Sequence, residues 1–422
     1  MSNYGRQSSR SGVVAIVFIY IASNIFSAVS ALLNSGKFTG SDFEEFGFET
    51  SSLLLNLYLV VIFYLLALLL YRSLQRKSDS ALPSNRDVVV LGWIAFIVQF
   101  IYMLCLTTGG VSLQQLKNEP SFATYFQTLF VPDYIFLAYY ALGRESRLFY
   151  PNLVLYLIST LLRGLAGGFI FLIFFELLLS FKRSKWLFFK ILIWSLVICS
   201  PFIYETRKLI RAAPPDYFLK TSISEHLIYI FNNAYMHINI LDALFDMTNI
   251  VFMRLQHLSS PVMIFDHLDD FWLGDAKGRF LSFFFEGQPQ ATIFGKSLTN
   301  SPPLSEYITT ALLPTPFGSW FIHPSLVGWL WVNPFEFPLL VVYCILLCAL
   351  SIFLVRKLGG RDYAVACTFL SFIIFAMNGW FGPYISTIQA LVILWVVSSF
   401  ANLIRISHPF RFGPSRCRVV RT

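Results

Sequence analysis

Arginine, histidine and aspartate side chains recur in this sequence at spacings that could bind anions and move protons. The pattern is densest at 241–257, where the apolar residues follow one stripe of an amphipathic helix. The opposite stripe carries Arg254 and His257, which are i,i+3 neighbours, and the i,i+4 pair Asp242 and Asp246. We expect this helix to present a cation, an imidazole and carboxylates together. A solvated polar face with an internal ion pair is the plainer alternative.

Three other arginines lie next to apolar runs, where a positive charge is unusual. Arg163 lies between two apolar runs and is followed closely by glycines. An arginine at membrane depth is costly and usually faces a cavity or a partner, unless it snorkels to the interface. Arg207 and Arg211 are i,i+4 neighbours after a further apolar run, and arginine can bind phosphate oxygens through two hydrogen bonds. A solvated helix end is the alternative for this pair.

Two further positions could supply a base. Asp266 opens the acidic cluster 266–270, which could provide a general base or hold a divalent cation, although a hydrated loop also explains it. His323 precedes Pro324 in an aromatic stretch and could act near a membrane surface, or it could be a core or interfacial histidine. The sequence has no HExxH or GxSxG motif, and its six cysteines show no zinc spacing. No metal or cofactor is therefore expected.

The elements that must position these residues are membrane-spanning helices. Hydrophobic residues make up 56% of the chain and charged residues 13%, whereas soluble domains have about half and about a quarter. The apolar residues form continuous runs of about twenty, which indicate transmembrane helices and not the alternating strands of a barrel. Ten spans are predicted, at 12–33, 52–71, 88–107, 122–142, 148–163, 164–181, 187–204, 337–355, 363–379 and 385–404.

The net charge of +8 is distributed as membrane topology requires, and no nucleic-acid-binding motif accompanies it. The first loop, after residue 33, holds four acidic residues and only one cation, Lys37. If both termini are cytoplasmic, the cationic loops and the cationic tail all lie on the inner side, in agreement with the positive-inside rule. These cationic segments are 72–86, 144–147, 182–185, 356–361 and 405–422.

We therefore predict an all-α integral membrane protein with about ten transmembrane helices and a long extracytoplasmic loop containing amphipathic helices. Residues 1–205 form an N-terminal bundle of about seven spans, and 206–336 form the periplasmic loop. Residues 337–404 supply about three more spans before a basic cytoplasmic tail at 405–422. The loop has eight Lys or Arg and eleven Asp or Glu and is rich in aromatic residues, so we expect it to pack on the membrane surface. Stretch 317–332 is a candidate re-entrant segment.

Three stretches resemble one bacterial family. The first is Leu161-Leu162-Arg163-Gly164-Leu165-Ala166-Gly167-Gly168 between two spans, and the second is Phe252-Met253-Arg254-Leu255-Gln256-His257-Leu258-Ser259-Ser260. The third is the late outer stretch with Pro314, Pro316, Phe317-Gly318 and Gly328. Together with the topology, these resemble the O-antigen polymerase (Wzy-type), or oligosaccharide repeat-unit polymerase, family. The resemblance covers roughly 150–335, and its motifs are loose.

This resemblance implies a metal-independent membrane glycosyltransferase in a bacterial inner membrane. Such an enzyme moves a growing glycan from undecaprenyl diphosphate onto a newly flipped lipid-linked repeat unit, on the periplasmic face. Its partners would be the lipid-linked donor and acceptor, the lipid bilayer and a chain-length regulator, with no nucleic acid. Two alternatives remain open: an O-antigen ligase, whose typical late histidine has only His323 as a match, and a lipid-linked oligosaccharide flippase or other transporter.

The same resemblance implies roles for the residues above. The leaving group is a lipid diphosphate, so positive charge is needed where negative charge develops. Arg163 and Arg254 would supply that charge, and His257 or Asp266 would act as the base on the acceptor hydroxyl. Aromatic rings could stack on sugars or anchor the chain at the interface. The expected substrate-binding residues are Arg207, Arg211, His323, Trp272 and Trp320.

Overall fold

The computed structural model describes residues 2–34, 37–39, 45–75, 85–109, 122–144, 146–162, 167–180, 190, 194, 228, 232, 255–285, 301–312 and 322–407. These residues are mostly helical, which is compatible with an all-α membrane protein. A short hairpin departs from the prediction, because β1 (Lys37–Thr39) pairs antiparallel with β2 (Glu45–Gly47). Phe38 and Phe46 face each other in this hairpin, and their rings stack with centroids 5.6 Å apart.

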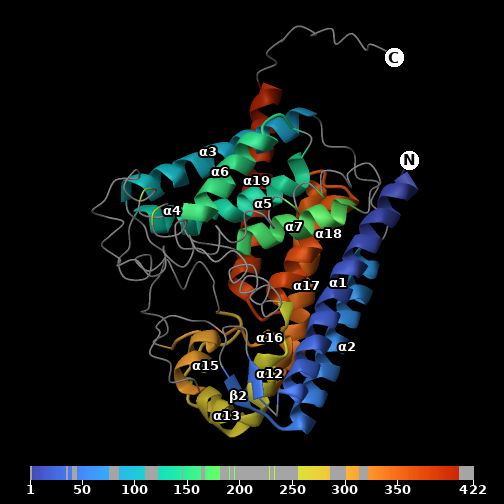
Figure 1. Ribbon diagram of the computed structural model, residues 1–422. Helices are drawn as coiled ribbons and strands as arrows, with labels where there is room; N and C mark the ends of the chain where they lie inside the picture. Colours follow the sequence, from blue (N-terminus) through green and yellow to red (C-terminus); the bar gives the residue numbers. More distant parts are fainter. Residues whose placement is uncertain are drawn as a thin grey trace.

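Long helices run side by side along one flank of the molecule (Figure 1). These are α1 (Ser2–Leu33), α2 (Thr50–Leu74) and α17 (Phe337–Lys357), and α19 (Phe381–Ser407) packs against α17. The start of α1 and the end of α19 lie at the same end of the molecule, which we call the terminal end (Figure 1).

A second group of helices lies near the terminal end and runs across the direction of α1 and α2 (Figure 1). It consists of α3 (Asn85–Gly109), α5 (Pro132–Gly143), α6 (Phe149–Leu162) and α7 (Gly167–Ser180). Segment 148–181, predicted as two spans, contributes two helices of 14 residues each, and the residues between them fall outside the described part.

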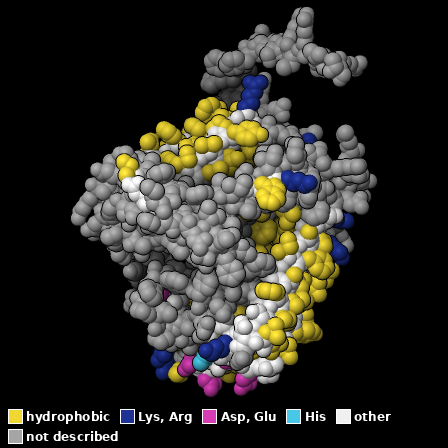
Figure 2. Space-filling view, viewed as in Figure 1, with side chains coloured by type: hydrophobic (Ala, Val, Ile, Leu, Met, Phe, Trp, Pro, Cys, Tyr) yellow, Lys and Arg dark blue, Asp and Glu magenta, His cyan; other side chains and the backbone are white. Residues whose placement is uncertain are grey.

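Five helices in the described ranges are long and apolar enough to cross a membrane, by length and composition. They are Arg10–Leu33, Thr50–Leu74, Val88–Cys105, Phe337–Lys357 and Phe381–Ala401. Their outward sides are apolar, and three leucines of α2 are each about half exposed: Leu65, Leu66 and Leu69. Figure 2 shows apolar side chains covering this flank between the two ends of the molecule. Such a surface is suited to lipid. The predicted span 187–204 lies outside the described residues, apart from two single positions.

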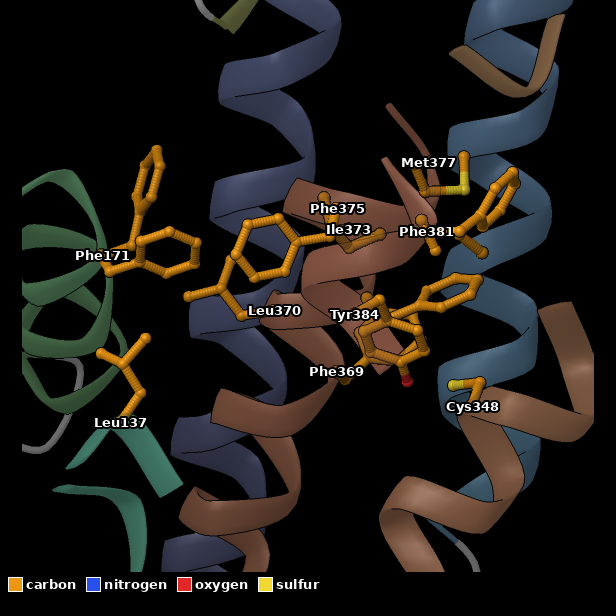
Figure 3. Packing of buried hydrophobic residues seen from close by; sticks show 14 of the residues in the cluster. Leu137, Phe171, Cys348, Phe369, Leu370, Ile373, Phe375, Met377, Phe381 and Tyr384 are labelled. Carbon is orange, nitrogen blue, oxygen red and sulfur yellow. The ribbon is translucent and has the colours of Figure 1, made fainter. Parts of the chain in front are cut away.

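The core is centred on α18 (Asp362–Ser371), which continues into a π-helical turn at Phe372–Ala376. Every residue from 364 to 373 is buried, so this helix is enclosed on all sides. Figure 3 shows its side chains between those of α5, α7 and α19, with Phe375 toward Phe171 and Phe369 beside Tyr384. The ring centroids of Phe171 and Phe375 are 4.9 Å apart.

The predicted span 122–142 is two helices instead of one. α4 (Phe122–Phe130) ends at Val131, whose φ of 39° is left-handed, and α5 begins at Pro132. Because proline has no N–H, the Thr128 carbonyl loses its helical partner at this break. Gln389 of α19 donates its side-chain amide to the Thr128 and Leu129 carbonyls, at 2.8 Å each. A neighbouring helix therefore satisfies the backbone where the proline interrupts it.

Short helices cap the other end of the molecule, which we call the capped end (Figure 1). They are α12 (Ser259–Asp266), α13 (Leu268–Ala276), α15 (Leu304–Leu312) and α16 (Ser325–Val332), and all four belong to the segment predicted as the long loop. Figure 2 shows acidic side chains gathered at this end. By contrast, Arg356 donates to the Leu74 carbonyl at the terminal end, and Arg10 binds Gln75 there.

Candidate functional site

Residues 255–258 enter the helix bundle between α1 and α2. The backbone N–H of His257 donates to Asn24 Oδ1 of α1 at 2.8 Å. The His257 Nδ1 atom shares a 2.6 Å hydrogen bond with the hydroxyl of Tyr64 on α2. Asn24 is itself fully buried and donates to the Tyr20 carbonyl at 2.8 Å. These contacts fasten a segment of the predicted loop to the first two long helices.

The depth of this insertion follows from the positions of its partners. Tyr64 lies fourteen residues beyond Thr50, the first residue of α2, which is about 21 Å along the axis at 1.5 Å per residue. Asn24 lies nine residues before Leu33, the last residue of α1, or about 14 Å from that end. His257 is therefore held near the middle of α2, well below the capped end.

Gln256 explains how the chain turns back toward the capped end. Its Oε1 accepts from the N–H groups of Leu258 and Ser259 at 2.9 Å, and its Nε2 donates to Ser259 Oγ at 2.8 Å. This pattern satisfies backbone donors at the start of α12. The predicted helix over 241–257 placed Gln256 and His257 on a polar face. Both are buried instead: the Gln256 amide pairs with the start of α12, and His257 pairs through its backbone N–H and its Nδ1 atom.

The imidazole of His257 is enclosed by aromatic rings. Its centroid lies 5.3 Å from that of Tyr20 and 6.0 Å from that of Tyr64. Only 5% of the residue is exposed, and burial lowers the pKa of His257 to about 3. The imidazole is therefore neutral at physiological pH and is a weak proton acceptor. This setting suits an anchor better than the general base that the sequence suggested.

Asp266 lies at the opposite end of α12, near the start of α2, and its side chain is exposed. Partial desolvation of its carboxyl raises the pKa of Asp266 above the usual value, and the nearby Glu49 raises this pKa further. The rest of the acidic cluster continues into α13, where His267 Nδ1 lies 3.9 Å from Asp270 Oδ2. Among the described residues, no group of three metal-ligating side chains comes together.

α16 runs alongside α12, and a hydrogen bond joins the last turn of α16 to α2. Trp331 donates its indole N–H to Asn56 Oδ1 of α2 at 2.7 Å. Gly328 permits the close approach of the two short helices, since a Cβ there would lie 2.8 Å from Ile264 Cδ1. The candidate sugar-stacking residue Trp272 donates its indole N–H to the Trp331 carbonyl at 2.8 Å and keeps 47% of its surface exposed.

His323 lies at the opposite end of α16, against the turn that joins α18 to α19. Its ring stacks on Trp380 with centroids 4.4 Å apart. Ser325 and Leu326 donate their N–H groups to the carbonyls of residues 378 and 377, each at 3.1 Å. Gly379 has a φ of +70° and no room for a side chain beside Ser325. His323 and Asp266 are therefore at opposite ends of the paired short helices.

The remaining predicted site residues lie outside the described part of the chain. They are Arg163, Arg207, Arg211, Arg254 and Trp320. Of the others, His257 is buried, Asp266 and Trp272 lie at the capped end, and His323 lies deeper, beside Trp380.

The structure also reveals polar residues that the sequence interpretation did not single out. Asn24 and Tyr64 are ordinary members of apolar helices until their long-range contacts with His257 are known. Glu176 of α7 is fully buried and forms an ion pair with Arg144, whose Nη2 lies 2.7 Å from Glu176 Oε2. The hydroxyl of Tyr140 also contacts both groups. A lone acid in an apolar run was the signal available for Glu176.

Comparison of the chain with models of known protein families, with curated proteins and with solved structures found no match.

Proposed function

We propose that this chain is a membrane glycosyltransferase that polymerises undecaprenyl-diphosphate-linked repeat units into O-antigen or a similar surface polysaccharide. The reaction takes place on the periplasmic face of a bacterial inner membrane. The observation that carries the proposal is the entry of 255–258 into the bundle, because Arg254 directly precedes this segment. In this proposal Arg254 binds the diphosphate of the lipid-linked donor.

The proposed topology has ten spans with both termini cytoplasmic. The ends of α1 and α19 share the terminal end, and the short helices of 255–332 occupy the capped end (Figure 1), which supports this topology. The capped end carries four aspartates in α12 and α13 beside the cations Lys277 and Arg279, whereas Arg10, Arg356 and Lys357 lie at the terminal end. This bias supports the orientation that the positive-inside rule predicts. The crosswise course of α3, α5 and α6 is the feature that the topology does not account for.

The proposed chemistry divides the work among three kinds of group. Arg254 and Arg163 neutralise the leaving diphosphate, with Arg207 and Arg211 as further phosphate ligands. Asp266 is the proposed base, because it is exposed and its pKa is raised toward the working range. Trp272 offers an exposed ring face on which a sugar can stack.

The first test is deletion of the gene in its host, followed by gel analysis of the lipopolysaccharide. A polymerase mutant retains lipid A–core with a single repeat unit and loses the ladder of longer chains. Core without any repeat unit would assign the chain to the ligase or flippase class and overturn the proposal.

The second test returns variants to the deletion strain at equal protein level. We expect Arg254→Ala to abolish the ladder and Arg254→Lys to restore little, since a lysine cannot bind two phosphate oxygens at once. Lys277→Ala is the matched control, because Lys277 is an exposed cation at the capped end. A full ladder from Arg254→Ala would exclude this arginine from the mechanism.

A further inference from the structure

One buried histidine, His257, forms two hydrogen bonds to residues far away in the sequence. Asn24 is 233 residues from His257 in the sequence, and Tyr64 is 193 residues away. All three are at most 5% exposed. Buried polar groups at a helix–helix contact are costly unless each is paired, so their presence here calls for a reason beyond packing.

We infer that Asn24, Tyr64 and His257 are positioning residues, which hold 255–258 inside the bundle and so fix the start of α12, the helix that ends at the proposed base Asp266. This inference rests on the proposed function. Leu255 and Gln256, which precede the anchored histidine, are also buried. Gln256 adds its bonds to the start of α12, so the chain is held on the far side of the anchor as well.

The geometry separates this role from that of a base in catalysis. A general base must come within hydrogen-bond distance of the acceptor hydroxyl, directly or through one water. His257 Nδ1 is already bonded to Tyr64, and the ring lies against Tyr20 and Tyr64. Because only 5% of His257 is exposed, a sugar hydroxyl could reach either ring nitrogen only if the segment left the bundle.

One substitution distinguishes the two roles. The side-chain amide of asparagine can place a hydrogen-bonding atom near the position of Nδ1, but an amide cannot accept a proton at neutral pH. A positioning role predicts that His257→Asn keeps at least about a third of the wild-type ladder. His257→Leu, Tyr64→Phe and Asn24→Leu should each lose it at least tenfold. Tyr20→Phe is the control, since Tyr20 meets His257 through its ring.

A second measurement tests the anchor without relying on activity. Ser260 is 6% exposed in the first turn of α12, and a Ser260→Cys reporter should react slowly with a membrane-impermeant maleimide. We expect Tyr64→Phe and Asn24→Leu to raise the labelling rate at least tenfold, and His257→Asn and Tyr20→Phe to leave it within about twofold. The chain with its six natural cysteines alone gives the background.

The outcomes are distinct. Faster labelling with loss of the ladder in the same variants, and retention of both in His257→Asn, supports the inference. Slow labelling with a lost ladder in His257→Asn would make His257 a base and overturn it. If the wild-type chain makes no ladder, the proposed function is wrong, and the labelling rates alone test whether Asn24, Tyr64 and His257 anchor the segment. In that case, unchanged labelling in Tyr64→Phe and Asn24→Leu would overturn the anchor itself.

Discussion

The ion pair between Arg144 and Glu176 is the most deeply buried pairing of opposite charges among the described residues. Glu176 is fully buried, and Arg144 also lies over the rings of Tyr140 and Phe149, at 5.3 and 5.6 Å from their centroids. A buried ion pair contributes little net stability compared with an apolar pair, but the loss of one partner leaves an uncompensated charge. The pair therefore matters most when it is broken.

Glu176→Leu should lower the free energy of unfolding by about 3–5 kcal/mol, because Arg144 would lose the carboxylate that compensates its largely buried charge. The double variant Arg144→Met with Glu176→Leu should recover most of that loss. Unfolding by sodium dodecyl sulfate in mixed micelles measures both. Glu336→Gln, at an exposed acid, is the control and should change stability by no more than about 0.5 kcal/mol. Equal losses in the single and double variants would contradict this account.

His257 predicts a dependence of stability on pH. Its folded pKa of about 3 lies below the unfolded value of 6.5, so the unfolded chain binds the proton more tightly. The stabilising contribution is present above pH 6.5 and is lost as the pH falls toward 3, at about 1.4 kcal/mol per pH unit. We expect a shallower loss in His257→Asn between pH 6 and pH 4, measured by the same unfolding assay.

Two carboxyls at the capped end have the opposite effect on the pH dependence of stability. Burial raises the folded pKa of Asp266 and of Asp275, whose Oδ2 accepts from Asn333 at 2.9 Å. A raised folded pKa means that the folded chain binds these protons more tightly, so their contribution falls as the pH rises through the folded pKa. If the stability of His257→Asn falls between pH 6 and pH 4 as steeply as that of the wild type, groups other than His257 dominate the acid response.

At the scale of the helices, the break between α4 and α5 depends on a residue from a third helix. Gln389 donates to the Thr128 and Leu129 carbonyls beside the break, and on the lipid-facing side of a bundle no water would replace it. Gln389→Leu should therefore cost about 1–3 kcal/mol. Ser399→Ala, at an exposed position on the same helix, should cost little. Thermal stability of the two variants in detergent checks this, and equal values would indicate that the carbonyls find other donors.

The sequence predicted most helices well where the signal is local. Continuous apolar runs place α2 and α17 within a few residues of their observed bounds, because length and composition alone determine such elements. The break at Val131 was missed, although Pro132 stood within the predicted span. A proline within an apolar run is compatible with a kink or a break, and only the donor on α19 decides between them.

The candidate site could be predicted only in part, for a related reason. Arg254 and His257 were selected by their spacing on one helix, but the bonds that bury His257 come from α1 and α2. No periodicity in the sequence connects residues that are some two hundred positions apart. The hairpin of β1 and β2 was missed because each strand has only three residues.

For the whole molecule, the two ends predict opposite exposure to the outside of the cell. Phe335, 95% exposed just before α17, should lie on the outer side, and Lys357, at the end of α17, on the inner side. A cysteine at position 335 should react with an impermeant maleimide in intact cells, and one at 357 only after permeabilisation. The parent chain provides the background. Labelling of both, or the reverse order, would contradict the proposed orientation.

The contact between His257 and the first two helices has a consequence for biosynthesis. Asn24 and Tyr64 are translated 233 and 193 residues before their partner. During that interval α1 and α2 carry polar groups whose final partner has not yet been made. Water, lipid headgroups or a chaperone must therefore interact with these polar groups of α1 and α2 until residues 255–258 have been made. In variants whose segment 255–258 does not dock, Asn24 and Tyr64 stay without this partner. Quality-control proteases should then recognise α1 and α2, far in the sequence from the mutation.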